Sequence, residues 1–303
     1  MSRPAKAIIS LVILVLLLMP GAMAALASFD ATRNQQHLPL PRGYLRGPES
    51  VAFDGEGNGP YSGVSDGRVL KWNGDKIGWT TYAYGPDYSS EKCTASKLCP
   101  ETVTESRSYK GLMRVGPGGG EVAVLVNEVD GAPLRFTNGV DVDQITGKVY
   151  FTDSSMNYRG DSTGRLMGYD PRMNNVTTLQ SGITYPNGVS ISHDRTHLVV
   201  ASTGPCKLLR YWIKGSNAGM MEPFANLPGY PDNVRQDSRG GYWVALHREK
   251  NELSFGFDSH LLAVRVGPNG KVLEEMRGPK SVRPTEIMER GNGKYYMGSV
   301  ELP

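Results

Sequence analysis

Phe136-Thr137-Asn138-Gly139-Val140 is one of four related stretches that decide the fold of this chain. The other three are Gly47-Pro48-Glu49-Ser50-Val51, Tyr185-Pro186-Asn187-Gly188-Val189 and Tyr230-Pro231-Asp232-Asn233-Val234. Each places an oxygen-bearing side chain just before a short β-like run, and these key positions, 49, 138, 187 and 232, are 89, 49 and 45 residues apart. A period of about 40–50 residues built from short strands is typical of a β-propeller with one blade per repeat. Equivalent positions on successive blades surround one axis, so we expect the four side chains to converge.

The composition agrees with this fold. The chain has 303 residues, among them 37 Gly and 20 Pro, which suits many short strands joined by tight turns. At about 45 residues per blade, we predict an all-β, six-bladed β-propeller. The net charge is +3 on 33 basic and 30 acidic residues, and no basic run contains interleaved aromatic residues. The sequence therefore predicts no nucleic-acid partner.

The N-terminus has the features of an export signal. Arg3 and Lys6 precede an apolar run over residues 7–19, and Ala-x-Ala cleavage sites end at Ala24 and Ala27. An uncleaved anchor helix is the alternative, but the run is shorter than the roughly 20 residues that span a bilayer. We therefore expect cleavage, with no stable membrane span left in the mature chain.

This interpretation divides the chain into a signal peptide over residues 1–27 and a single propeller domain over residues 28–303. The mature chain is expected in the secretory pathway, which means the endoplasmic reticulum lumen, the vacuole or the extracellular space. Export also bears on the cysteines, because disulfides form in oxidising compartments. Cys93 and Cys99 are close together in a polar loop and suit a disulfide, whereas Cys206 is expected to be a buried small hydrophobic residue. Asn175-Val176-Thr177 is a sequon, which predicts N-glycosylation of Asn175.

Two of the six expected blades look incomplete. Between residues 87 and 110 the chain shows no inner strand, so the second blade is expected to be degenerate. The last repeat begins near Arg283 and has too few residues before Pro303 for a full blade. Either this is a natural short form or the sequence is truncated. Residues 38–46 are the segment expected to pair into the last blade and close the ring.

The converging side chains suggest a metal site. Glu49, Asn138, Asn187 and Asp232 offer hard oxygen donors without sulfur or imidazole, which is the ligand chemistry of calcium. Asn233 is either a fifth ligand or a group that orients a substrate oxygen. The alternative is that the Asn-Gly pairs only form tight turns before strands. That alternative does not account for the two carboxylates in the same register, so we favour the metal.

Four longer phrases resemble the plant strictosidine-synthase-like family. They are Leu134-Arg135-Phe136-Thr137-Asn138-Gly139-Val140-Asp141, Val149-Tyr150-Phe151-Thr152-Asp153-Ser154-Ser155, Leu209-Arg210-Tyr211-Trp212 and Pro228-Gly229-Tyr230-Pro231-Asp232-Asn233. The resemblance runs from about residue 40 to the C-terminus. It implies a six-bladed propeller related to the calcium-dependent paraoxonase, gluconolactonase and organophosphatase propellers, whose metal is held by Glu, Asn, Asn and Asp. On this resemblance those ligands correspond to Glu49, Asn138, Asn187 and Asp232, and Asn233 matches a further paraoxonase ligand.

One departure from the family bears on the reaction. The resemblance implies that authentic strictosidine synthase joins an amine to an aldehyde with a sixth-blade glutamate as its acid/base. The register of the repeat places Arg283 at that position, and a permanent cation cannot accept a proton from the amine. Glu286 lies three residues further on, where we expect it to face away or be buried. Arg283 therefore argues against strictosidine synthesis.

Three functions follow from these residues. The first is a calcium-dependent hydrolase of a small, largely apolar ester or lactone, in which Asp232 helps to orient or deprotonate the nucleophile or His247 acts as the base. The second is a condensing or lyase-type enzyme of alkaloid-type specialised biosynthesis that takes an amine and an aldehyde. The third is a non-catalytic propeller with structural calcium, with a role in pollen or cell-wall formation suggested by family analogy.

Overall fold

The computed structural model describes residues 26–31, 36–41, 45, 47–86, 88, 111–154, 160–250, 259–291 and 293–301. These residues form 24 strands and no helix, which confirms the all-β prediction. Accordingly, nothing within those ranges is a helix long and apolar enough to cross a membrane.

Four sheets of four or five strands form blades. The first two are β2 (Val51–Ala52), β3 (Tyr61–Gly63), β4 (Arg68–Trp72), β5 (Trp79–Tyr84) with β7 (Gly120–Glu121), and β11 (Thr137–Val142), β12 (Val149–Asp153), β13 (Gly164–Asp170) with β14 (Asn175–Ile183). The other two are β15 (Pro186–Ile191), β16 (His197–Ser202), β17 (Lys207–Trp212) with β18 (Met221–Asn226), and β19 (Gly229–Gln236), β20 (Tyr242–Glu249), β21 (Ser259–Val266), β22 (Val272–Pro279) with β1 (Ala27–Asp30).

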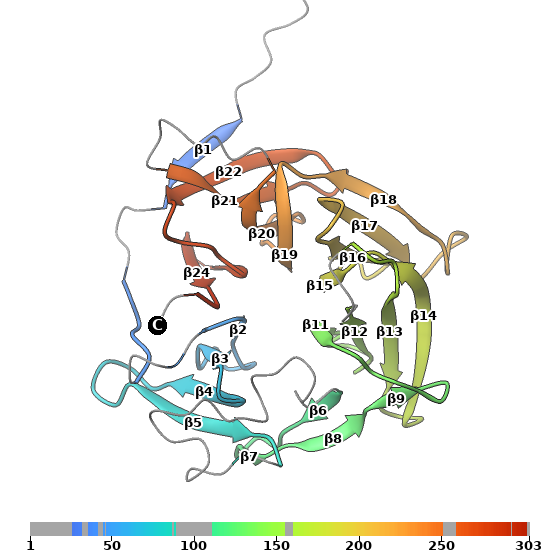
Figure 1. Ribbon diagram of the computed structural model, residues 1–303, viewed down its shortest axis with the longest axis horizontal. Helices are drawn as coiled ribbons and strands as arrows, with labels where there is room; N and C mark the ends of the chain where they lie inside the picture. Colours follow the sequence, from blue (N-terminus) through green and yellow to red (C-terminus); the bar gives the residue numbers. More distant parts are fainter. Residues whose placement is uncertain are drawn as a thin grey trace, which may run out of the picture.

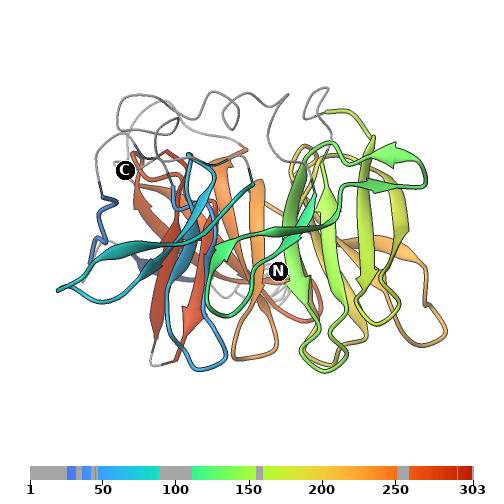
Figure 2. The ribbon, with the colours of Figure 1, turned by 90° about the horizontal axis from the view of Figure 1, so that it is seen from below.

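The blades are arranged in a ring around a central axis (Figure 1). The first strand of each blade, β2, β11, β15 or β19, lies nearest the centre, and later strands lie progressively further out. Seen from the side, the inner strands run roughly along the ring axis, whereas outer strands such as β5 are strongly inclined to it (Figure 2). The prediction of a propeller is therefore confirmed.

The prediction of six blades is not confirmed, because only four sheets in the described ranges have four or more strands. The remaining strands form two-stranded sheets. These sheets are β6 (Leu112–Arg114) with β8 (Ala123–Val126), β9 (Glu128–Val129) with β10 (Ala132–Pro133), and β23 (Glu286–Arg290) with β24 (Lys294–Gly298). The weak second and last repeats expected from the sequence correspond to β6–β8 and β23–β24. The β23–β24 sheet lies between the blade of β19 and the blade of β2, because β23 contacts both of those strands.

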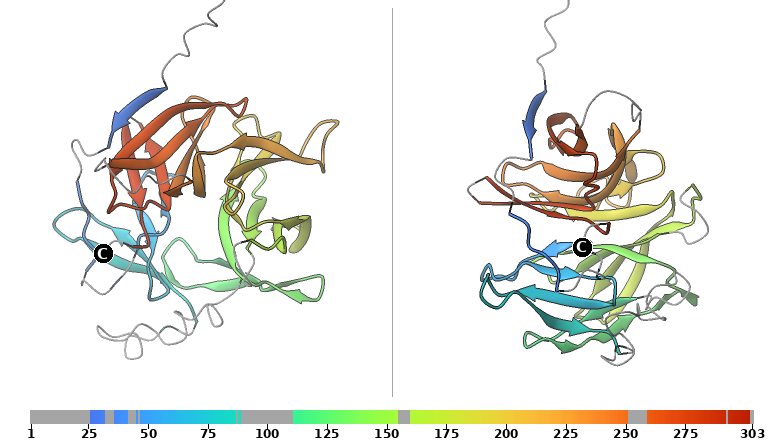
Figure 3. Two further views of the ribbon diagram at one scale, coloured as in Figure 1. Left: turned by 45° about the horizontal axis from the view of Figure 1, so that its top comes forward. Right: turned by 60° about the vertical axis from the view of Figure 1, so that its left-hand side comes forward.

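The N-terminal segment pairs differently from the prediction. The described residues within 38–46 form no strand, and Leu40 and Leu45 instead pack into an apolar cluster with Leu70. It is β1 that adds to a sheet, pairing in parallel with β22 on the outer edge of the blade (Figure 3). Phe29 of β1 contacts Trp243 and Tyr295, with ring centroids 5.9 and 5.6 Å away. The segment of β1 thus contacts the β23–β24 sheet through an aromatic ring and pairs as a strand with β22.

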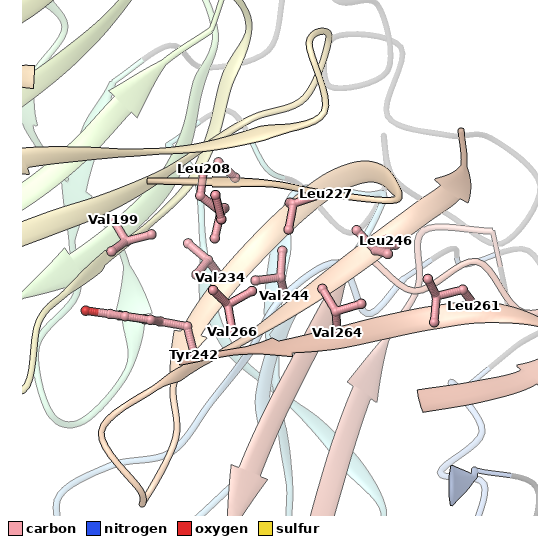
Figure 4. Close-up of a cluster of buried hydrophobic side chains, with 12 residues drawn as sticks. Val199, Leu208, Leu227, Val234, Tyr242, Val244, Leu246, Leu261, Val264 and Val266 are labelled. Atoms are coloured by element: carbon pink, nitrogen blue, oxygen red, sulfur yellow. The ribbon is translucent and has the colours of Figure 1, made fainter. Parts of the chain in front are cut away.

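The apolar core lies between neighbouring blades. The largest cluster joins Val199 and Leu208 of one blade to Val234, Val244 and Val264 of the next (Figure 4). Every residue of β16 is buried, as expected for a strand covered by other blades on both faces. This packing stabilises the inner strands and so fixes the positions of the residues that surround the axis.

Several predictions about modification concern residues away from this core. Cys206 is buried with a free thiol, as expected, and burial raises its pKa. Cys93 and Cys99 lie outside the described residues, as does most of the predicted signal peptide. Asn175 is exposed at the start of β14, the outermost strand of its blade. Its glycosylation stays a prediction.

Candidate functional site

The repeated motif forms the same β-bulge on three inner strands. Two residues of the inner strand face one residue of the neighbouring strand at Asn138-Gly139, Asn187-Gly188 and Asp232-Asn233. Such a bulge redirects a side chain without ending the strand. Asn138 and Asn187 therefore lie inside β11 and β15, and their glycines do not have positive φ angles. The alternative that Asn-Gly only forms turns before strands is wrong for both pairs.

The glycines allow these inner strands to approach each other closely. A Cβ atom on Gly139 would lie 2.5 Å from the backbone oxygen of Asn187, and one on Gly188 would lie 2.6 Å from the Cα atom of Asn233. Real Cβ atoms do not approach backbone so closely, so only glycine fits at either position. The result is that the bulges of β11, β15 and β19 lie side by side at the axis.

Glu49 joins this group from the other end of the chain. The amide nitrogen of Asn233 lies 3.4 Å from the Glu49 Oε1 atom, although 184 residues separate the two in sequence. Ser50 donates to the other carboxylate oxygen of Glu49 at 2.9 Å. Thr285 bridges the segments that carry Glu49 and Asn233. Its hydroxyl donates to the Glu49 carbonyl at 2.7 Å, and its carbonyl accepts from the Asn233 backbone amide at 3.0 Å.

The side-chain amides of Asn138 and Asn187 are oriented alike. Each donates through Nδ2 to a hydroxyl oxygen, Asn138 to Ser154 at 3.3 Å and Asn187 to Thr203 at 3.4 Å. The Asn187 Oδ1 atom is buried and has no hydrogen-bond partner in the described part of the structure. Buried carbonyl oxygens are usually paired, so an unpaired one needs an explanation.

A bound cation would explain it. Within the described ranges no three His, Cys, Asp or Glu side chains cluster to hold a metal. A metal at the axis would therefore depend on amide oxygens together with carboxylates. Two carboxylates and two or three amide oxygens match the preference of Ca²⁺ for hard oxygen ligands. The residues present thus fit calcium.

Polar side chains also occur three residues after some of the candidate ligands, and we call them the second layer. Two of its members had no predicted role. Arg235 comes three residues after Asp232, and Asp141 comes three residues after Asn138. Arg235 donates to both carboxylate oxygens of Glu286, at 3.0 and 2.9 Å, and to the Val140 carbonyl at 3.4 Å. Glu286 is completely buried, as expected. Arg235 and Asp141 could have been found in the sequence, because each lies three positions after a residue of the repeated motif.

Burial dominates the electrostatics of this second layer. It raises the pKa of Glu286, which the positive charge of Arg235 opposes. Burial also raises the pKa of Asp141, against the hydrogen bond of 2.8 Å that its carboxylate accepts from the Ile191 backbone amide. For Arg235, burial is the largest single effect and favours loss of the proton, but the charge and hydrogen bonds of Glu286, together with the charges of Asp141 and Glu49, outweigh it and the pKa is raised. The guanidinium therefore stays charged beside the candidate site.

His247 occupies the same register position as two residues that contact the site amides. Ser154 and Thr203 each follow the residue that pairs with the start of a bulge, and His247 follows Leu246, which pairs with Pro231. The His247 Nε2 atom lies 3.7 Å from Glu301 Oε1. Arg283 donates to the His247 carbonyl at 3.4 Å and lies 3.8 Å from the other Glu301 oxygen. Arg283 and His247, predicted separately, are thus neighbours, and Glu301 is a group that the sequence analysis missed.

The sequence of this chain is similar to those of known proteins. Residues 138–216 match the family model described as "Strictosidine synthase". Residues 30–72 match the family model described as "Strictosidine synthase-like, N-terminal". Protein strictosidine synthase-like 10 of Arabidopsis thaliana is 36% identical over 85% of this chain and 83% of its own length. The chain belongs to the strictosidine synthase-like family. Strictosidine synthase-like 2 from the same plant is 39% identical over 87% of each chain.

Two solved structures share this fold at low sequence identity. A gluconolactonase from Xanthomonas campestris has a TM-score of 0.62 and 15% identity, covering 88% of this chain and 86% of its own. The calcium-binding protein regucalcin from Agrobacterium tumefaciens has a TM-score of 0.58 and 15% identity, covering 86% and 82%. At this identity the likeness of this strictosidine synthase-like chain to both proteins shows the propeller fold alone.

Proposed function

We propose that this chain is a calcium-dependent hydrolase of a small, largely apolar ester or lactone, exported through the secretory pathway. The observation that carries the proposal is the buried, unpaired Oδ1 atom of Asn187 in a bulge beside Asn233, which in turn contacts Glu49. We also propose that β6–β8 and β23–β24 are reduced blades of a six-bladed ring. The names gluconolactonase and calcium-binding protein on two structures of this fold agree with the proposal.

In this mechanism Glu49, Asn138, Asn187, Asp232 and Asn233 would hold the calcium ion. When bound, calcium supplies a Lewis acid that polarises a carbonyl oxygen and stabilises the oxyanion. His247 accepts a proton from the attacking water through its imidazole, and the Glu301 carboxylate, 3.7 Å from Nε2, favours the protonated ring that results. Asp232 can alternatively orient or deprotonate the nucleophile. Arg283 bonds the His247 carbonyl and so helps to hold this strand end in place.

A condensing or lyase activity is the second candidate, and a non-catalytic protein with structural calcium is the third. Arg283 disfavours condensation, because no proton acceptor stands at that position. Glu286, the nearest carboxylate in sequence, is buried and bonded to Arg235, so it does not replace the missing acid/base.

The test compares the mature chain with Glu49→Gln in calcium and in chelator. We measure thermal unfolding together with hydrolysis of aryl esters and lactones. Calcium at 100 times its Kd should stabilise the wild-type chain by about 2.7 kcal/mol and support hydrolysis. The variant should lose both effects, whereas the exposed control Glu121→Gln should keep both. Stabilisation without turnover would support the non-catalytic candidate, and no calcium effect would reject the site.

A further inference from the structure

Two hydroxyl groups around the axis have their single proton committed elsewhere. The Ser154 hydroxyl donates to the carbonyl of Pro186, and the Thr203 hydroxyl donates to the carbonyl of Pro231 at 2.7 Å. Each of these carbonyls belongs to the inner strand of the following blade. The backbone of both residues is held as well, since Ser154 donates to Phe136 at 2.8 Å and Thr203 donates to Tyr185 at 3.1 Å.

This commitment decides how the neighbouring amides must point. A hydroxyl has one proton to donate, so the oxygens of Ser154 and Thr203 can only accept from the asparagines. Asn138 and Asn187 must then present Nδ2 to the hydroxyl and turn Oδ1 away from it. For Asn187 this orientation leaves Oδ1 buried and without a partner, which an unconstrained amide would avoid by rotating.

Asn233 is held in a similar way, because the Ser50 hydroxyl, whose proton is donated to Glu49, accepts from its Nδ2 group. Its Nδ2 group lies 3.3 Å from the Ser50 hydroxyl and 3.4 Å from the Glu49 carboxylate. For Asn233 the carboxylate of Glu49 favours the same orientation, because an amide nitrogen is a donor and a carboxylate is an acceptor. A hydroxyl acceptor whose proton is committed elsewhere therefore faces each of the three site amides.

We propose that Ser154 and Thr203 are positioning residues that keep the Oδ1 atoms of Asn138 and Asn187 turned toward the axis, ready to bind a cation. This inference rests on the proposed calcium site. A hydroxyl on one blade donates to the backbone of the next blade and thereby determines which end of the asparagine amide, Oδ1 or Nδ2, faces the axis. Substitution of residues that orient metal ligands typically weakens affinity 10- to 100-fold.

The test is a double-mutant cycle in calcium affinity, measured by isothermal titration calorimetry. Thr203→Val should weaken calcium binding about 10-fold or more, and Thr203→Ser should restore it. Asn187→Asp removes the dependence on orientation, because a carboxylate has an oxygen on both sides. In that background Thr203→Val should change Kd less than about twofold. Ser202→Ala is the matched control, since the Ser202 hydroxyl also donates to a backbone carbonyl but contacts no site amide.

The outcomes separate this inference from the proposed function. A wild-type chain that binds no calcium rejects the proposed site itself. Calcium binding that Thr203→Val leaves unchanged, or that it weakens equally in the Asn187→Asp background, overturns only the positioning role. If Thr203→Val does not fold, the cycle of Ser154→Ala with Asn138→Asp decides by the same criteria.

Discussion

Arg235 of β19 and Glu286 of β23 form a two-point ion pair, with the carboxylate completely buried and the guanidinium partly buried, that links the last complete blade to the two-stranded sheet beside it. The guanidinium Nε and Nη2 atoms lie 3.0 and 2.9 Å from the two carboxylate oxygens. The Arg235 Nη1 atom also reaches the Val140 carbonyl on β11. One side chain therefore connects three inner strands directly behind the candidate site.

Breaking this pair should destabilise the propeller strongly. Glu286→Gln removes the ion-pair partner of the mostly buried Arg235 charge, so we expect a loss of about 3 kcal/mol in the free energy of unfolding by urea. The double variant Arg235→Met with Glu286→Leu should lose less than Glu286→Gln alone. The control is Arg239→Met, which breaks the more exposed pair with Glu274 and should cost about 1 kcal/mol or less. Equal losses at the two pairs would contradict the structural role assigned to Arg235.

Gly188→Ala should disturb the site and the fold together. The added Cβ would lie 2.6 Å from backbone atoms of Asn233 and Val234, so the inner strands must move apart. We expect a loss of about 1–3 kcal/mol in urea unfolding and weaker binding of calcium in titration calorimetry. Gly63→Ala, at a strand glycine with no atom within 4 Å of the added Cβ, should change neither quantity appreciably. If the two variants behaved alike, the close approach of β15 and β19 would not be real.

His247→Gln should separate chemistry from metal binding. We expect kcat for ester or lactone hydrolysis to fall about 100-fold or more, because the side chain can no longer accept a proton near neutral pH. Stabilisation by calcium should persist, because the imidazole is not among the proposed ligands. His193→Gln, which alters an exposed histidine in the turn after β15, serves as the control in the same assays. Full activity of His247→Gln would leave Asp232 as the candidate base.

The ion pair of Asp143 with Arg195 should make stability depend on pH. The Arg195 guanidinium, 2.7 Å away, holds the pKa of the Asp143 carboxyl well below its usual range. Because the folded-state pKa is lowered, this contribution is fully present above the unfolded pKa of about 3.9 and decreases as the pH falls below it. Asp143→Asn should therefore cost about 1.5–3 kcal/mol at pH 7.

The same comparison at lower pH provides the check. Urea unfolding at pH 7, 5 and 3 should show the wild-type and Asp143→Asn curves apart at the first two values and closer at the third. A difference that stays constant down to pH 3 would mean that the carboxylate charge contributes nothing.

Much of the fold could be predicted from local patterns. The short β-branched and aromatic runs, the turn residues and the constant register of four motifs are properties of neighbouring residues, and they led to a propeller with converging oxygen donors. The burial of Cys206 and Glu286 followed from the same patterns. The described part of the expected closing segment, residues 38–46, forms no strand, and it is β1 that adds to a sheet. Its partner β22 lies about 250 residues away, and no local feature of residues 27–30 specifies that partner.

The sequence by itself thus determined the repeat, its register and the kinds of donor atom near the axis, because strand periodicity repeats with the chain. The tertiary structure decided what depends on distant segments meeting. It placed Asn233 beside Glu49 across 184 residues, and it paired Arg235 with Glu286. It also set the direction of the Asn187 amide, because that depends on a hydroxyl whose proton is taken by the backbone of the next blade.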